Sequence, residues 1–484
     1  MSLTQKGFSG FIYTFVSSVL SKVLLFGGGI YLARLLTPED FGLVAMIYII
    51  FAISNFLISG GFGLAIIREK TITEADKSTV FYFNVLTSVF LYILIWFGAP
   101  GIADFYQREE LVFLTRLMGL DLLFNSLTII QNSVLQRELK FKYLSIIQVV
   151  SVVITIIVAI LLAHTGFGVI ALAIKFILTS FVSSIMLFII NPWIPKGFIN
   201  KKSFKKLFAF SSHVMLLGLV NNITRNIHQV VIGKYFLVSS LGFFNQGNML
   251  KDNVTNTLND TVMKVSFPML SQLQEDKARL KKSYLRLLEI NTFTIFPIIT
   301  ILILTAEPLI LGLLGEKWQG SIVFLQILGI SGYVRHLHSI NLNILKVYGK
   351  GRDYLAQGII RNGVTIIGIL IAVKYSVIAI AWALVVTEFL QLFVNIYYSN
   401  KYINFKFSEQ FKLIFPIILI TILMAISIYG LSLISFPNEL LKLFVLGIGG
   451  LFIYVGLSFL FKIKALYEIV GLIKPRLNSL ILKK

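Results

Sequence analysis

Basic side chains that interrupt long apolar stretches are the residues of this sequence best suited to bind a ligand. Eight cations occur within such stretches, against five acids, which leaves an excess of three positive charges. A charge at the centre of a lipid bilayer costs about 2.5 to 3.5 kcal/mol, so such residues normally face a bundle interior or a water-filled cavity. The cations are Lys22, Arg116, Lys175, Arg225, Lys251, Lys264, Arg335 and Arg361, and the acids are Asp121, Asp252, Asp260, Glu289 and Glu388. This excess predicts a cavity that attracts anions.

Polar residues also gather on single faces of three of these stretches. At 100° per residue, residues 207–232 carry Asn221, Asn222, Arg225, His228 and Gln229 on one face, and residues 241–270 carry Asn245, Asn248, Lys251, Asp252, Thr255 and Asn259. In residues 8–33, Thr14, Ser18 and Lys22 follow one another at intervals of four. Hydrogen bonding between helices, worth roughly 0.6 kcal/mol per contact, explains the amides and hydroxyls but not the cations. We therefore expect a positively charged cavity that binds an anionic, partly polar molecule, with amides and hydroxyls that can bond sugar hydroxyls.

The remaining charged and histidine residues indicate structure rather than catalysis. Counted from the outer ends of their helices, Arg361 and Glu388 lie twelve and eleven residues deep, so we predict that a hairpin pairs them as a structural ion pair. Lys175 and Arg335 lie deep within their predicted spans without polar neighbours, and we assign no role to them. His336 and His338 diverge on a helix, and no metal site is expected. The chain has no Cys and shows no Ser/His/Asp set or carboxylate pair, so we assign no catalytic residue and no cofactor.

The elements that carry these residues are predicted to be membrane-spanning helices. With 57% hydrophobic and 13% charged residues, the composition excludes a soluble enzyme, a secreted disulfide scaffold and a disordered chain. Windows of roughly 20 apolar residues recur along the chain, and the alternating pattern of a membrane β-barrel is absent. We predict fourteen spans, at residues 8–33, 41–63, 79–99, 111–135, 143–163, 167–190, 207–232, 241–270, 287–304, 319–345, 356–373, 377–399, 413–434 and 443–461.

The net charge of +21 is mainly a signal of orientation. Of the basic residues, 29 lie at the termini and in every second connection, whereas the opposite connections hold 6. Lys and Arg near helix ends are retained in the cytoplasm, so both termini are predicted to be cytoplasmic. The first apolar run is interpreted as a helix and not a removed signal peptide. Short bursts of basic residues between apolar runs favour anionic lipid over nucleic acid as the partner, and the short connections exclude soluble catalytic or ATP-hydrolysing domains.

An internal repeat predicts two lobes. With an offset of 200 residues, the stretch 30–34 aligns with 230–234, and Phe41-Gly42 aligns with Leu241-Gly242. Six spans lie within the offset, so the two copies point the same way and should be related by an axis along the membrane normal. We predict an N-terminal lobe at 1–200, a C-terminal lobe at 201–405 and two additional helices with a basic tail at 406–484, with a cleft between the lobes. Chance alignment of two apolar strings is the alternative.

Three segments resemble one known family. Residues 33–42 (ARLLTPEDFG), with residues 136–141 (QRELKF) and the stretch from Ile232-Gly233-Lys234 to Leu241-Gly242, are similar to the polysaccharide transporter (Wzx-type) flippases. That family shares a superfamily with the lipid II flippase MurJ and the MATE exporters. The resemblance covers the first twelve predicted helices, and it implies two six-helix lobes around a cavity lined by helices 1, 2, 7 and 8.

By this resemblance the substrate would be an undecaprenyl-pyrophosphate-linked oligosaccharide, moved to the outer leaflet of the bacterial inner membrane for O-antigen, capsule or exopolysaccharide assembly. Lys22, Arg225 and Lys251 would then hold the pyrophosphate or acidic sugars, beside Asn221, Asn222, Asn248 and Asn259. A polysaccharide polymerase and a chain-length regulator would be partners, and a proton or sodium gradient could drive the cycle. The family commonly has an acidic residue where this chain has His228, so either a cation-coupling site has changed here or the position is structural, and we carry over no proton or sodium role to it. A MATE-like cation-coupled multidrug exporter is the alternative, and a membrane glycan polymerase or ligase comes third.

Overall fold

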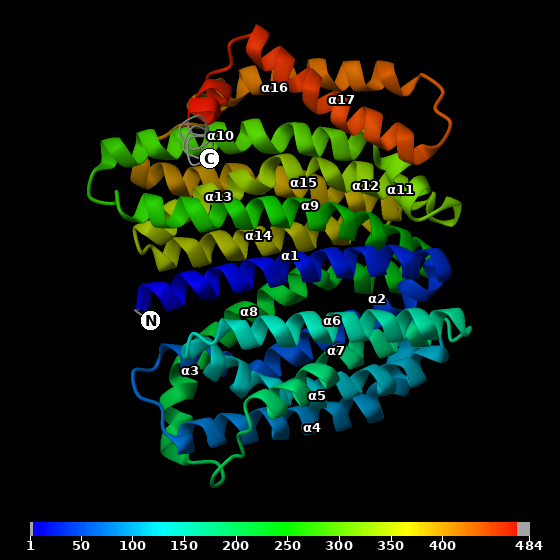
Figure 1. Ribbon diagram of the computed structural model, residues 1–484, viewed down its shortest axis with the longest axis vertical. Helices are drawn as coiled ribbons and strands as arrows, with labels where there is room; N and C mark the ends of the chain where they lie inside the picture. Colours follow the sequence, from blue (N-terminus) through cyan, green and yellow to red (C-terminus); the bar gives the residue numbers. More distant parts are fainter. Residues whose placement is uncertain (1–2, 472–484) are drawn as a thin grey trace, which may run out of the picture. The chain divides into compact units, whose positions relative to one another are not determined.

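The computed structural model describes residues 3–471, apart from the side chains of residues 3–12, 209, 210, 213, 214, 216, 217, 261, 264 and 265. The side chain of Lys264, one of the eight cations within the apolar stretches, therefore lies outside the described part of the structure. Every regular element in the described part of the chain is a helix (Figure 1). The helices are α1 (Leu3–Leu35), α2 (Pro38–Ser59), α3 (Phe62–Arg68), α4 (Glu74–Tyr106), α5 (Glu110–Arg137), α6 (Phe141–His164), α7 (Val169–Ile190), α8 (Lys201–Tyr235), α9 (Val238–Ser271), α10 (Lys277–Leu304), α11 (Ala306–Leu313), α12 (Ser321–Ile330), α13 (Gly332–Val347), α14 (Gly351–Ala372), α15 (Val377–Ile403), α16 (Phe407–Ser432) and α17 (Glu439–Leu460), with a short 3-10 turn at Glu316–Trp318.

Each predicted span corresponds to one helix or to two successive helices. Among the described residues, 11 helices are long and apolar enough to cross a membrane. Helices α8 and α9, with 35 and 34 residues, are also long enough but carry the polar stripes. The predicted span 41–63 is two helices, because Gly60 and Gly61 adopt left-handed φ angles of 52° and 74° that end α2 and start α3. The span 319–345 likewise divides into α12 and α13 at Ser331. The total of fourteen spans stays a prediction.

The chain forms two compact units, Met1–Gly242 (unit 1) and Phe243–Lys484 (unit 2). In unit 1, α8 packs on α2, α3 and α4, and α1 packs on α6. In unit 2, α16 and α17 lie beside α10, as Figure 1 shows, and share one hydrophobic core with it. The structure therefore places α8 in unit 1 with the helices that precede it. It places both α16 and α17 in unit 2, against α10. The division into 1–200, 201–405 and 406–484 rests on the repeat and stays a prediction.

Two glycines related by the 200-residue offset make a reciprocal backbone contact within unit 1. Gly42 is the fifth residue of α2 and Gly242 the fifth residue of α9. A Cβ atom on Gly42 would meet the carbonyl oxygen of Val238, the first residue of α9, and one on Gly242 would meet the carbonyl oxygen of Pro38, the first residue of α2. Both contacts bring the first turns of α2 and α9 together through backbone atoms.

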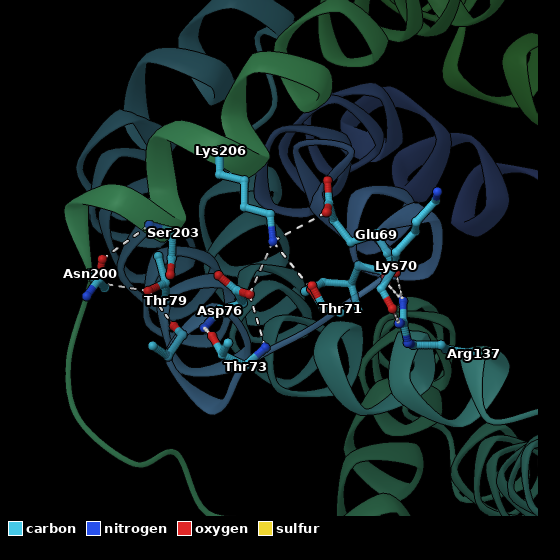
Figure 2. A network of polar contacts seen from close by, with 12 residues as sticks. Glu69, Lys70, Thr71, Thr73, Asp76, Thr79, Arg137, Asn200, Ser203 and Lys206 are labelled. Atoms are coloured by element: carbon cyan, nitrogen blue, oxygen red, sulfur yellow. Dashed lines mark hydrogen bonds and ion pairs between the residues drawn. The ribbon is translucent and has the colours of Figure 1, made fainter.

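A polar network fixes the connection between α3 and α4 against the start of α8 (Figure 2). The guanidinium of Arg137 donates to the carbonyls of Ile66 at 2.9 Å and Lys70 at 2.7 Å, which satisfies the end of α3. The ammonium of Lys206 on α8 lies 3.3 Å from Glu69 and 3.5 Å from Asp76, where Asp76 also completes the capping box of α4. The six-residue apolar core at Phe62 lies beneath this network. The basic start of α8 is thus tied to the connection between α3 and α4.

Candidate functional site

The residues of the stripe predicted on α8 differ in exposure. Asn221 and Arg225, one helical turn apart, are exposed, whereas His228 and Gln229 are buried. Asn222 is half-buried, and its amide donates to the carbonyl of Gly218 at 3.0 Å. That the five residues share one face of α8 stays a prediction. Helix α8 packs on α2, and Gly218 lies directly against the ring of Phe56.

Lys22 lies on the accessible side of α1. Ser17 and Ser21 are buried on the side that packs on α6, where the Ser17 hydroxyl lies 3.0 Å from the Ser145 hydroxyl. Thr14 and Lys22 are exposed and Ser18 is half-buried, so the predicted spacing of four residues does follow one face. A lysine at mid-span that is turned away from the packed side is expensive in lipid, so its position fits a water-filled space.

The stripe on α9 forms a polar seam with α13 inside unit 2. Asn256 accepts a hydrogen bond of 3.0 Å from the Arg335 guanidinium, and Asn259 accepts one from the Ser339 hydroxyl. Further along, the Asn343 amide donates to the Ser266 hydroxyl at 2.9 Å. Asn259 of the predicted stripe and the nearby Asn256 therefore serve helix packing, as hydrogen bonding between helices predicts.

Lys251, the cation of that stripe, is buried and paired. Its ammonium lies 3.0 Å from the Asp252 carboxylate, and its side chain is 9% exposed. Asn248 donates to the other oxygen of Asp252 at 3.3 Å. Lys251, Asn248 and Asp252 thus form one cluster, and an incoming anion would have to compete with Asp252 for the lysine.

A second charged cluster in unit 2 joins α13 to α15. Nε2 of His338 lies 3.1 Å from the Glu388 carboxylate, and Nδ1 of the same ring lies 2.6 Å from the Asn395 amide nitrogen. Arg335 and Lys251 both act electrostatically on Glu388. The contact that the structure gives for Glu388 is thus His338. The hydrogen bond it gives for the Arg361 side chain is to Asn362, and the pairing of Arg361 with Glu388 stays a prediction.

Sequence reasoning missed His338 and left Arg335 unassigned. Arg335, His338 and Ser339 are spaced at i, i+3 and i+4, which puts them on one face of α13. That spacing was visible in the sequence. It was hidden by considering His338 only together with His336, which points elsewhere and contacts the Thr292 hydroxyl of α10 at 3.0 Å.

Unit 1 contains a buried acid of its own. The Asp121 carboxylate of α5 is 3% exposed and accepts hydrogen bonds from Ser180 of α7 at 2.6 Å and from Asn55 of α2 at 3.0 Å. Asn55 in turn accepts one from the Asn125 amide at 2.7 Å. These bonds hold three helices together and satisfy the carboxylate. Among the described residues, no group of three His, Cys, Asp or Glu side chains is placed to hold a metal ion.

Comparison with known proteins identifies the family. Residues 31–323 match the model of a family described as polysaccharide biosynthesis protein, so the chain belongs to that family. It is 26% identical over 437 residues to the teichuronic acid biosynthesis protein TuaB of Bacillus subtilis, covering 89% of this chain and 90% of that protein. It is 25% identical to the succinoglycan biosynthesis transport protein ExoT of Rhizobium meliloti, covering 71% of this chain and 70% of that protein.

Solved structures establish the class of fold. The lipid II flippase MurJ, in an inward closed conformation, matches with a TM-score of 0.77 at 20% identity over 94% of this chain and 98% of that chain. An inward-facing MATE family multidrug resistance transporter matches with a TM-score of 0.62 at 15% identity over 79% and 94%. The predicted all-α membrane fold and the resemblance to Wzx-type flippases are confirmed. The protein is a multi-pass membrane protein of polysaccharide biosynthesis.

Proposed function

We propose that this protein is a flippase that moves an undecaprenyl-pyrophosphate-linked oligosaccharide from the cytoplasmic to the outer leaflet of the bacterial inner membrane. The observation that carries the proposal is the set of basic side chains within the helices of a fold shared with a lipid-linked precursor flippase. Such side chains favour an anionic headgroup. A MATE-like exporter of organic cations would require an excess of acids instead. No covalent chemistry is needed, because transport by alternating access changes only which leaflet the site faces.

Three cations are proposed to hold the pyrophosphate or acidic sugars: Lys22 and Arg225, which are exposed, and Lys251, which is released from Asp252 when the anion arrives. Asn221, Asn222, Asn248 and Asn259 are proposed to bond sugar hydroxyls, although Asn248 and Asn259 also have partners within unit 2. A polymerase and a chain-length regulator of the same assembly process are the proposed protein partners.

Removing the three cations tests this site. We expect the triple variant Lys22→Ala, Arg225→Ala, Lys251→Ala to flip labelled lipid-linked oligosaccharide at least about tenfold more slowly, because one lost charge-assisted contact alone is worth about 1.5 kcal/mol or more. The measurement is leaflet access of the labelled lipid in reconstituted vesicles.

A matched triple variant provides the control. Lys374, Lys412 and Lys462 are exposed and outside the predicted spans, so changing all three to Ala removes the same charge and should leave flipping intact. Unimpaired flipping after loss of Lys22, Arg225 and Lys251 would contradict the proposal that these residues bind the substrate.

The proposed orientation has a test of its own, because the chain contains no natural cysteine. Lys202, exposed in the first turn of α8, is proposed to lie on the cytoplasmic side together with both termini. A Lys202→Cys variant should react with a membrane-impermeant maleimide only after the vesicle or cell is opened. The variant Lys442→Cys, on the opposite side, should react from outside. The reverse pattern would overturn the orientation.

A further inference from the structure

We infer that His338 and Glu388 form a proton-binding pair that controls how strongly the basic cluster of unit 2, Lys251 and Arg335, binds an anion. The inference deepens the proposed function and rests on it, since it concerns the anion site of the same transporter. The pair lies between α13 and α15, with Nε2 of His338 3.1 Å from the Glu388 carboxylate. Ionisable groups within membrane-spanning segments are rare and commonly serve proton transfer.

The pair combines a buried base with an accessible acid. The side chain of His338 is 11% exposed and that of Glu388 is 31% exposed. A carboxylate with that exposure at mid-span is far too costly to face lipid, so Glu388 borders a space that water can enter. The distance of 3.1 Å between Nε2 of His338 and the Glu388 carboxylate suits an ion pair. Protonation of the ring would turn this close approach into a strong charge pair.

Asn395 accommodates both protonation states of the ring. Its amide nitrogen lies 2.6 Å from Nδ1 of His338, while its amide oxygen is buried without a hydrogen bond. In this orientation the amide donates, and Nδ1 must be unprotonated. A rotation of the amide by 180° exchanges nitrogen and oxygen and allows a protonated Nδ1 to donate to the oxygen. The histidine can therefore gain a proton on Nδ1 and donate it to the rotated amide oxygen.

The charges around the pair determine the sign of the effect. Arg335 lies one turn before His338 on α13, and Lys251 approaches from α9 with Asp252 as its partner. On the α10 side, His336 contacts Thr292, and on α14 the Arg361 guanidinium contacts Asn362. With a neutral ring, the negative charge of Glu388 acts on Arg335 and Lys251 and disfavours the binding of an incoming anion. Proton uptake by the pair cancels that negative charge, so anion binding and proton binding strengthen each other.

Sulfate binding to the purified protein tests the inference, because the charge of sulfate does not change across the relevant pH range. We expect calorimetry to show about tenfold tighter binding at about pH 5.5 than at about pH 8. The variant Glu388→Gln should bind tightly at both pH values, and His338→Gln should bind weakly at both. His164→Gln, which changes an exposed histidine hydrogen-bonded to Tyr31 in unit 1, should keep the wild-type pH dependence.

The outcomes separate this inference from the proposed function. Equal sulfate affinity at the two pH values, or an unchanged pH dependence in His338→Gln, would overturn the pair while leaving the anion site in place. Absence of sulfate binding at both pH values would overturn the anion site and the pair together. Should a variant fail to fold, the wild-type protein decides the question, since calorimetry in buffers of different ionisation enthalpy must show proton uptake with each sulfate bound.

Discussion

The variants Gly42→Ala and Gly242→Ala are each expected to lose about 3 kcal/mol or more of stability, although they add only one methyl group. The new Cβ atoms would meet the carbonyl oxygens of Val238 and Pro38. Both obstacles are backbone atoms, which cannot rotate away as a side chain can, so the starts of α2 and α9 would have to separate. Overpacking commonly costs 1 to 3 kcal/mol even where side chains can adjust. Close helix contacts through small residues are the usual way in which membrane helices associate.

Thermal unfolding in detergent is the measurement, with Gly29→Ala as the matched control. Gly29 lies in α1, and a Cβ there would meet nothing within 4 Å. Alanine is favoured over glycine in a helix by about 0.5 to 1 kcal/mol, so the control should unfold at the same temperature or slightly higher. Wild-type unfolding temperatures for both Gly42→Ala and Gly242→Ala would show that the contact is loose. A defect in only one variant would argue against the reciprocal arrangement.

From the sequence, only the recurrence of a glycine after Phe or Leu could be recognised, and not the contact that these glycines make. Gly42 and Gly242 could be aligned because an offset of 200 residues preserves helix order, and the helices themselves followed from apolar length. What the two glycines touch could not be derived, because contact partners depend on how helices pack and not on local pattern. The short helix α3 was also missed, since Gly60 and Gly61 interrupt a stretch whose apolar content is continuous.

For the candidate site too, the sequence predicted some features and could not predict others. That Lys251 belongs to a polar stripe was predictable from 3.6-residue periodicity, but its pairing with the neighbouring Asp252 was not. Adjacent residues on a helix point 100° apart, and only the long lysine stem bridges that angle. The joining of Arg335, His338 and Glu388 needs the register between α13 and α15, which no periodicity supplies. The excess of positive charge thus indicated which helices carry the candidate site. It did not indicate which acids lie beside the cations within that site.

Trp318 provides the second large expected effect. It lies in the connection between the predicted spans 287–304 and 319–345. In the structure it is fully buried at 0% exposure, in the 3-10 turn after α11, with its ring 6.3 Å from that of Phe243 in an edge-to-face arrangement. The short helix α11 packs on α12 and α17 and brings this connection back onto unit 2.

We expect Trp318→Ala to cost about 3 to 5 kcal/mol, because it removes a fully buried aromatic side chain and leaves a cavity. The midpoint of thermal unfolding should fall by an amount on the order of 10 °C. Trp382→Ala is the matched control, since Trp382 on α15 is 45% exposed and its loss opens no cavity. Trp318→Phe should recover part of the loss, as it restores much of the apolar volume. Equal unfolding midpoints for Trp318→Ala and Trp382→Ala would mean that the connection does not anchor unit 2, and that the apolar core around α10 is stable without it.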